Sequence, residues 1–108
     1  MRLDKNVDDL IGYASAISGL PEDDLASRKQ NKIYMPIRRA LMDVLRHEAG
    51  FTLDRIGEYL HKDYTTIIHN LGCPDTEERK NYRELLTNYW YEQLELDLKE
   101  SIRINSVE

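Results

Sequence analysis

The chain of 108 residues has little cysteine and no long apolar run. Its single cysteine, Cys73, cannot form a disulfide within the chain, and a reducing cytoplasm is the simplest compartment for such a protein. No stretch approaches the roughly 18 consecutive apolar residues that a membrane-spanning helix needs. The first ten residues are too acidic and polar for a secretory signal. We therefore expect a cytoplasmic protein that does not associate with a membrane.

Basic residues are also scarce. The 15 Lys and Arg residues are outnumbered by 20 Asp and Glu residues, which gives a net charge of −5. A DNA-binding protein usually carries a basic face, so this balance argues against one. The charge is unevenly distributed, however. Residues 28–69 carry eight basic and five acidic side chains, whereas residues 1–27 and 70–108 each carry a net charge of −4. Because salt screens charges over about 8–10 Å, the basic centre can act locally.

Signals of catalysis are missing. The sequence has no Gly-rich G-x-x-x-x-G-K-[ST] loop, so we expect no nucleotide binding. His69 and Cys73 are four residues apart and His61 is nearby, but Gly72 and Pro74 interrupt any helix there and no fourth metal ligand is evident. No nucleophile–base arrangement follows from such scattered residues. We expect neither an enzyme nor a protein that holds a cofactor or a metal.

Residues 51–70 show two short runs of helical periodicity, separated by a break at residues 61–63. The apolar positions of the two runs are Leu53, Ile56, Tyr59 and Leu60, and then Ile67, Ile68 and Leu71. Thr52 and Asp63 precede the runs, and each can cap a helix by accepting a hydrogen bond from a first-turn N–H. Two short helices joined by three or four residues are typical of a helix-turn-helix, whose second helix enters the major groove of DNA.

Two details of this stretch carry structural expectations. Gly57 lies inside the first run, where glycine costs roughly 1 kcal/mol relative to alanine, so we expect another element to pack closely against it. Core packing is the alternative to a DNA contact for Ile67 and Ile68, and for Ile68 we expect it.

The seven residues at 63–69, Asp-Tyr-Thr-Thr-Ile-Ile-His, resemble the DNA-reading helix of the C-terminal domain of DnaA, the bacterial replication initiator. The family pattern is Asp-His, then Thr or Ser, then Thr, two aliphatic residues and His, so the chain departs from it at Tyr64. Upstream residues that match the family are Leu53, Ile56 and Gly57. The resemblance extends weakly back to about Val7 and fades after Leu71. It implies an all-α fold that binds double-stranded DNA, and a stand-alone domain of this kind would suit a phage or mobile element.

The resemblance also implies which residues contact DNA. At base edges in the major groove we expect Asp63, Tyr64, Thr65 and Thr66. At phosphates we expect Arg38, Arg46 and His69, with Lys62 at a phosphate or a base edge. In the minor groove we expect one basic residue of the preceding loop: Arg28, Lys29 or Lys32. The chemistry is suitable, because aspartate accepts from cytosine and threonine methyls contact thymine.

Other helices are predicted over residues 4–18, over residues 33–49 as the longest central helix, and from Asp75, which we expect to cap a long C-terminal helix. Residues 20–25 are expected to form a turn or a single helical turn. Arg39 can pair with Asp43 four residues on. The fold class expected is thus all-α, a single five-helix domain, with a DnaA-like helix-turn-helix in residues 1–74 and a long helix in residues 75–108 packed on it.

Two functions are compatible with this pattern. The first is sequence-specific binding of double-stranded DNA in the control of replication or transcription. The second is a protein-interaction module that keeps the fold without binding DNA, such as an inhibitor of a DNA-binding partner, which the acidic ends favour. The apolar side chains between residues 85 and 98 cover more than one helix face, so a homodimer through the C-terminal helix is a further expectation.

Overall fold

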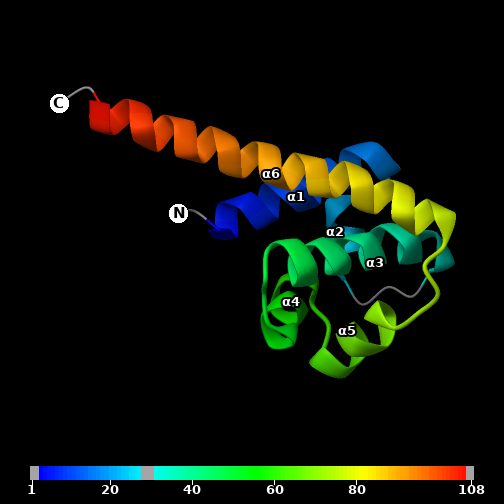
Figure 1. The fold of residues 1–108 in the computed structure, drawn as a ribbon. Coiled ribbons are helices and arrows are strands. Elements are labelled where there is room, and N and C mark those ends of the chain that lie inside the picture. Colours follow the sequence, from blue (N-terminus) through cyan, green and yellow to red (C-terminus); the bar gives the residue numbers. More distant parts are fainter. Residues whose placement is uncertain (1–2, 28–30, 107–108) are drawn as a thin grey trace.

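The computed structural model describes residues 3–27 and 31–106, and every regular element within these ranges is helical, which confirms the all-α prediction (Figure 1). The α-helices are α1 (Leu3–Ser18), α2 (Glu22–Leu25), α3 (Met35–Asp43), α4 (Leu53–Leu60), α5 (Tyr64–Leu71) and α6 (Glu77–Ser106). A 3₁₀ turn, η1 (Lys32–Tyr34), precedes α3, and a π-helical turn, η2 (Val44–Glu48), follows it. The described chain therefore has six α-helices where five were expected, because residues 22–25 form a helical turn of their own.

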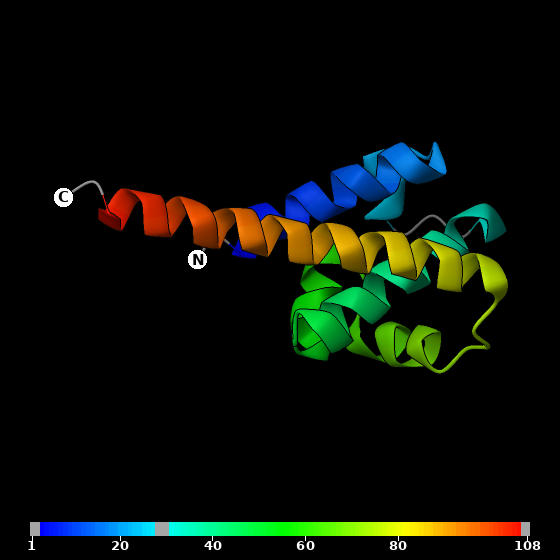
Figure 2. The same ribbon diagram turned by 45° about the horizontal axis from the view of Figure 1, so that its top comes forward.

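The core lies around α3, between α6 and α1 on one side and α4 and α5 on the other (Figures 1 and 2). Leu10 of α1 and Leu41 of α3 are fully buried, and Leu86 and Trp90 of α6 join the same cluster. The first half of α6 therefore contributes to the core that the preceding helices form.

The central helix runs without a break over residues 32–48, close to the predicted 33–49, but changes type along its length. It opens as a 3₁₀ turn and ends as a π turn, in which the Ala49 N–H donates to the Val44 carbonyl at 2.9 Å. A π turn fits one more residue into the turn than an α-helix does, so the side chains after it are rotated relative to those before it. Gly50, with φ of +72°, then ends the helix. Arg38, in α3, is buried, whereas Arg46, within η2, is exposed.

The turn between α4 and α5 has the predicted caps and the predicted close approach. The Thr52 hydroxyl accepts from the Arg55 N–H at 3.2 Å, and Asp63 accepts from the Thr66 N–H at 2.8 Å. A Cβ at Gly57 would lie 2.3 Å from the Lys62 carbonyl oxygen. His61 closes α4 with φ of 55°, in the left-handed region. The chain therefore reverses tightly over Gly57 and enters α5 at an angle fixed by packing and by two caps.

The beginning of α6 differs from the prediction. Thr76, not Asp75, caps the helix, because the Arg79 N–H donates to the Thr76 hydroxyl at 3.2 Å. Asp75 instead receives two hydrogen bonds from Arg83, at 2.9 and 2.8 Å. Glu77 and Glu78 lie in the first turn, where they interact favourably with the helix dipole.

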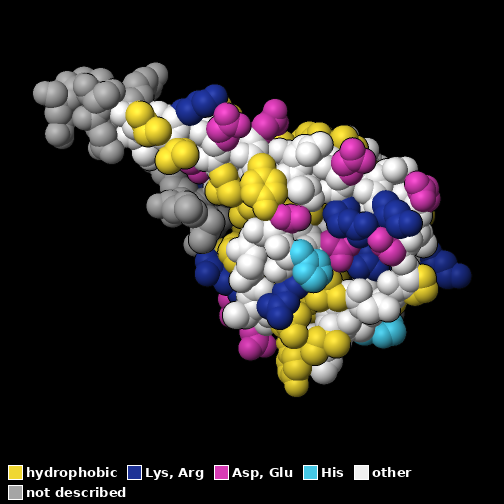
Figure 3. All heavy atoms as spheres, in the orientation of Figure 1, with side chains coloured by type: hydrophobic (Ala, Val, Ile, Leu, Met, Phe, Trp, Pro, Cys, Tyr) yellow, Lys and Arg dark blue, Asp and Glu magenta, His cyan; other side chains and the backbone are white. Residues whose placement is uncertain are grey.

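The second half of α6 extends past the other helices beyond Asp97, whose carboxylate accepts a hydrogen bond from Asn6 of α1 at 3.1 Å (Figures 1 and 2). With 30 residues α6 is about 45 Å long, and the molecule measures 51 × 25 × 23 Å. Leu96, Leu98 and Ile102 on this half are exposed, and Figure 3 shows hydrophobic side chains gathered along it. None of the described helices combines the length and the apolar character needed to cross a membrane.

Candidate nucleic-acid interface

The N-terminus of α5 presents its polar side chains outward. Asp63 Oδ1 accepts from both the Thr66 N–H and the Thr65 hydroxyl, each at 2.8 Å. Thr65 and Tyr64 are exposed and Thr66 is half-buried, so none of these three is buried in the core. The carboxylate of Asp63 holds the first turn in shape, and this leaves the side chains of the turn in a defined position for contact with a ligand.

An apolar pair continues this surface along α5. Tyr64 and Ile68, four residues apart, are 52% and 48% exposed. The prediction that Ile68 lies in the core is wrong. Ile67 and Asn70 define the buried face, and each further residue turns about 100° around the helix, which carries Ile68 off that face. The sequence offered two i,i+4 pairs, Tyr64 with Ile68 and Ile67 with Leu71, and packing shows that the second pair faces the core.

A groove of about 450 Å³ lies between α3 and α5. Its basic and titratable side chains are Arg39, Lys62 and His69, together with the almost fully buried Arg38, and Met35 and Met42 form its apolar part. Thr65, Thr66 and Asn70 of α5 also line it, and none of the described residues in the lining is acidic. This side of α5 therefore favours an anion.

The other side of the α4–α5 turn has the opposite character. A hollow of about 640 Å³ there is lined by the carboxylates of Asp54, Glu58 and Asp63, together with His61 and Lys62. Three carboxylates repel a polyanion more than one lysine attracts it. A duplex would have to approach α5 from the α3 side, and Lys62 borders both hollows.

Arg38 is not at the surface, and the prediction that it contacts a phosphate is wrong. Its side chain is 1% exposed. The guanidinium donates to the carbonyl oxygens of Asp24 and Leu25, where it satisfies the C-terminal end of α2, and it stacks 4.8 Å from the ring centre of Tyr34. Burial lowers the pKa of Arg38, and the charges of Tyr34 and Asp24 oppose this effect. Arg38 therefore has a structural role, because its hydrogen bonds join α3 to the end of α2.

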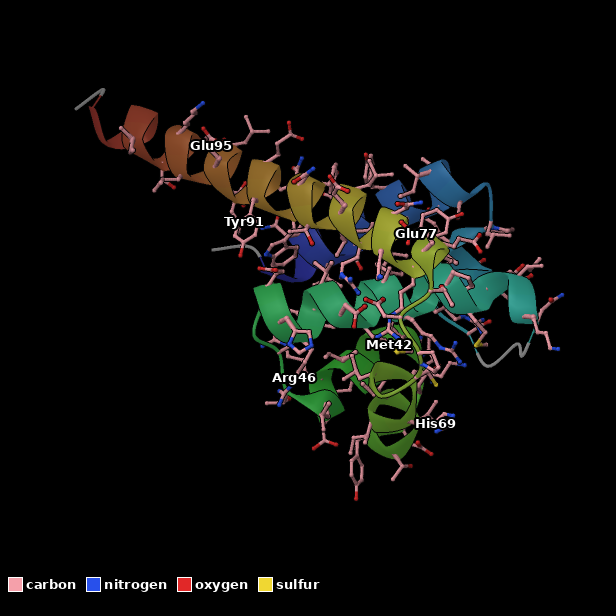
Figure 4. All side chains as sticks on the ribbon, turned by 45° about the vertical axis from the view of Figure 1, so that its right-hand side comes forward. Met42, Arg46, His69, Glu77, Tyr91 and Glu95 are labelled. Atoms are coloured by element: carbon pink, nitrogen blue, oxygen red, sulfur yellow. The ribbon has the colours of Figure 1, made fainter. Side chains whose placement is uncertain are left out.

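The other two expected phosphate contacts are exposed but separate. Arg46 Nη1 donates to the Phe51 carbonyl at 3.0 Å, at the end of η2. Figure 4 shows Arg46 beside α4 and His69 beyond α5, with Met42 between them. The structure thus does not bring Arg38, Arg46 and His69 onto one surface.

The loop before α3 is described only in part. Arg28 and Lys29 lie outside the described residues. Lys32 is exposed in η1, one residue after Asn31, whose side chain accepts from the Ile33 N–H at 3.1 Å. Lys32 is therefore available at the surface, while the minor-groove contact expected of this loop stays a prediction.

Arg39 is the residue that sequence reasoning missed. Its Nε donates to Asn70 Oδ1 at 3.0 Å and so joins α3 to α5. The expected pairing with Asp43 is absent, because Asp43 is buried against α6 and binds Arg79 at 2.7 Å and Arg83 at 3.0 Å. No spacing rule could have shown this, since Asn70 follows Arg39 by 31 residues.

His69 and Cys73 approach each other, with 3.8 Å between Nε2 and Sγ. Among the residues whose positions are described, no group of three His, Cys, Asp or Glu side chains is placed to hold a metal ion. The Cys73 thiol instead donates to the His69 carbonyl at 3.3 Å, which places it as a satisfied side chain at the end of α5.

No family model, no curated protein and no solved structure matches this chain. What the α4–α5 unit binds therefore has to follow from its own residues.

Proposed function

We propose that the chain binds double-stranded DNA sequence-specifically through α5 and controls replication or transcription. The observation that carries the proposal is the position of Thr65 and Thr66, which stand at the N-terminus of α5 beside a groove lined by Arg39, Lys62 and His69. The resemblance of residues 63–69 to the DNA-reading helix of DnaA supports the same assignment.

In this proposal the N-terminal residues of α5 meet base edges in the major groove. The hydroxyls and methyls of Thr65 and Thr66 read polar groups and thymine methyls, and the exposed Tyr64 and Ile68 add apolar contact. Tyr64 stands where the DnaA pattern has His, so the preferred sequence differs from the DnaA site. The net charge of −5 makes binding weaker and more sensitive to salt than in a basic domain.

Selection of bound duplexes from a random library, followed by fluorescence anisotropy titrations, tests the proposal. The purified chain should enrich one sequence and bind it more tightly than a scrambled duplex. Thr66→Ala should relax preference at one base pair by about 1–3 kcal/mol. Thr87→Ala on α6 is the matched control and should change nothing. Equal affinity for enriched and scrambled duplexes contradicts the proposal.

A second candidate function is a protein-interaction module. The acidic hollow formed by Asp54, Glu58 and Asp63 favours it, because carboxylates beside α5 suit a basic protein surface better than a duplex. Such a module can inhibit a DNA-binding partner by covering the partner's basic surface. Passage straight through a heparin column at low salt favours this candidate, and retention favours DNA binding.

We also propose that the projecting half of α6 pairs with a second copy of the chain. Leu98 and Ile102 are four residues apart and so share one helix face. In an antiparallel pair centred on Leu98, Lys99 of one copy comes near Glu95 of the other, and the same contact recurs by symmetry. Within one copy the same two side chains form an exposed ion pair at 3.2 Å, which the contact between copies would replace.

A further inference from the structure

We propose that Arg39, held in position by Asn70, binds a DNA phosphate. This contact fixes which base pair lies opposite the N-terminus of α5. This inference rests on the proposed DNA-binding function and deepens it. It does not follow from the resemblance to DnaA, which points to Arg38 and Arg46 as the phosphate contacts of the central helix.

A chain of hydrogen bonds connects Arg39 to the reading turn. Arg39 Nε donates to Asn70 Oδ1 at 3.0 Å, and Asn70 Nδ2 donates to the Thr66 carbonyl at 2.8 Å. Asn70 is only 8% exposed, and both ends of its amide are satisfied, so its orientation is fixed. The guanidinium is thereby tied to the residue that we expect to read a base.

The hydrogen bond to Asn70 uses Nε of the Arg39 guanidinium and leaves its two Nη atoms for a ligand. Only Nε is engaged, and both Nη atoms make no hydrogen bond to any residue that the structure describes. These two atoms carry four N–H donors in a planar fork, the geometry that binds two phosphate oxygens at once. Because Asn70 already orders the side chain, less conformational entropy is lost when a phosphate binds.

The surroundings keep the charge of Arg39 available. The groove contains Lys62 and His69, and its described lining includes no carboxylate that would neutralise the guanidinium. Arg79 and Arg83 on α6 are different, because Asp43 and Asp75 occupy their guanidinium groups. Arg39 therefore combines a fixed position with an unneutralised charge.

The partner that fits is a phosphodiester of duplex DNA. Thr66 and Asn70 are one helical turn apart on α5, so a phosphate held at Arg39 has a fixed offset from the base edge near Thr66. A contact of this kind adds affinity on every sequence, and it also determines which base pair Thr66 meets.

Anisotropy titrations over a range of KCl concentrations test the inference, with the full chain, the enriched duplex and a scrambled duplex. Arg39→Gln should raise Kd about tenfold on both duplexes and lower the slope of log Kd against log salt by about 0.9, the value for one phosphate contact. Arg39→Lys should keep the slope and lose part of the affinity, because lysine keeps the charge but not the fork. Lys80→Gln, an exposed cation on α6, is the matched control and should leave Kd and slope unchanged.

Asn70→Ala tests positioning separately. It keeps the charge of Arg39, so the salt slope should stay at the wild-type value while Kd rises. Combined with Arg39→Gln it should add nothing further to Kd, because both changes remove one interaction. A full additional loss in the double variant contradicts the positioning role.

The two proposals fail in different ways. If the wild-type chain binds no duplex, DNA binding and the role of Arg39 are both overturned. If the wild type prefers the enriched duplex and Thr66→Ala loses that preference, but Arg39→Gln keeps the wild-type Kd and slope, only the inference about Arg39 is overturned. Circular dichroism checks folding. Should Arg39→Gln unfold, Arg39→Lys decides, and wild-type affinity in that variant refutes the fork.

Discussion

The backbone at Gly57 packs directly against the carbonyl oxygen of Lys62, so closely that a Cβ at residue 57 would come within 2.3 Å of it. Only glycine leaves room for the chain to fold back over α4 in this way. The contact sets the angle between α4 and α5, and with it the direction in which Thr65 and Thr66 point.

Gly57→Ala should therefore destabilise the fold. The new methyl meets backbone, which cannot move aside as a flexible side chain can, and overpacking of this kind costs about 1–3 kcal/mol. Urea denaturation followed by circular dichroism measures the loss. Gly72→Ala is the matched control, since the nearest atom to its Cβ would lie at 3.6 Å, and φ at Gly72 is −84°. Equal stability of the two variants would contradict the steric explanation.

The features that the sequence predicted correctly depend on neighbours a few residues away. The Thr52 and Asp63 caps each bind an N–H three residues on, and Gly57 meets a residue five positions later. Such contacts depend mainly on the local sequence, which is why they can be predicted from it.

The features that the sequence missed depend on distant partners. Arg38 is buried because α2 ends where its guanidinium lies, 13 and 14 positions earlier in the chain. Asp43 binds Arg79 across 36 positions, and that contact leaves Arg39 to Asn70. The π turn after α3 also could not be predicted, because its spacing depends on how the whole helix packs. Tertiary packing thus decides which of the two adjacent arginines is buried and which stays partly exposed at the groove.

Asp43 and Arg79 should make a large contribution to stability. Both side chains are about 95% buried, and Arg79 binds Asp43 through two hydrogen bonds, at 2.8 and 2.7 Å. Asp43→Ala leaves two arginines of α6 without their buried partner, and loss of one member of a buried ion pair costs about 3–5 kcal/mol. Chemical denaturation measures this loss. Glu84→Ala, which removes an exposed carboxylate of α6, is the control and should have little effect. A small loss for Asp43→Ala would show that water reaches the pair.

Stability should also fall in acid because of Asp75. The hydrogen bonds from Arg83 lower the pKa of this carboxyl below its ordinary value of 3.8. A group with a lowered pKa in the folded state stabilises that state fully above the unfolded pKa, and the contribution is lost as pH falls through the folded pKa. The urea concentration at the midpoint of unfolding should therefore decrease as the pH falls below about 4. Asp75→Asn should reduce the drop, whereas an unchanged pH profile in this variant would contradict the role of Asp75.

The projecting half of α6 should determine the oligomeric state. Leu98 and Ile102 are 61% and 59% exposed on one helix face, and Leu96, 57% exposed, is two residues before Leu98 and hence about 200° around the helix. A single partner helix can cover only one of these two faces. Placing a charge on the paired face buries it without a partner, which is unfavourable. Light scattering should therefore give the mass of a dimer for the wild type and for Leu96→Glu, and that of a monomer for Leu98→Glu and Ile102→Glu. A wild-type chain that stays monomeric at high concentration excludes pairing through α6, and a Leu96→Glu monomer would move the interface to the opposite face.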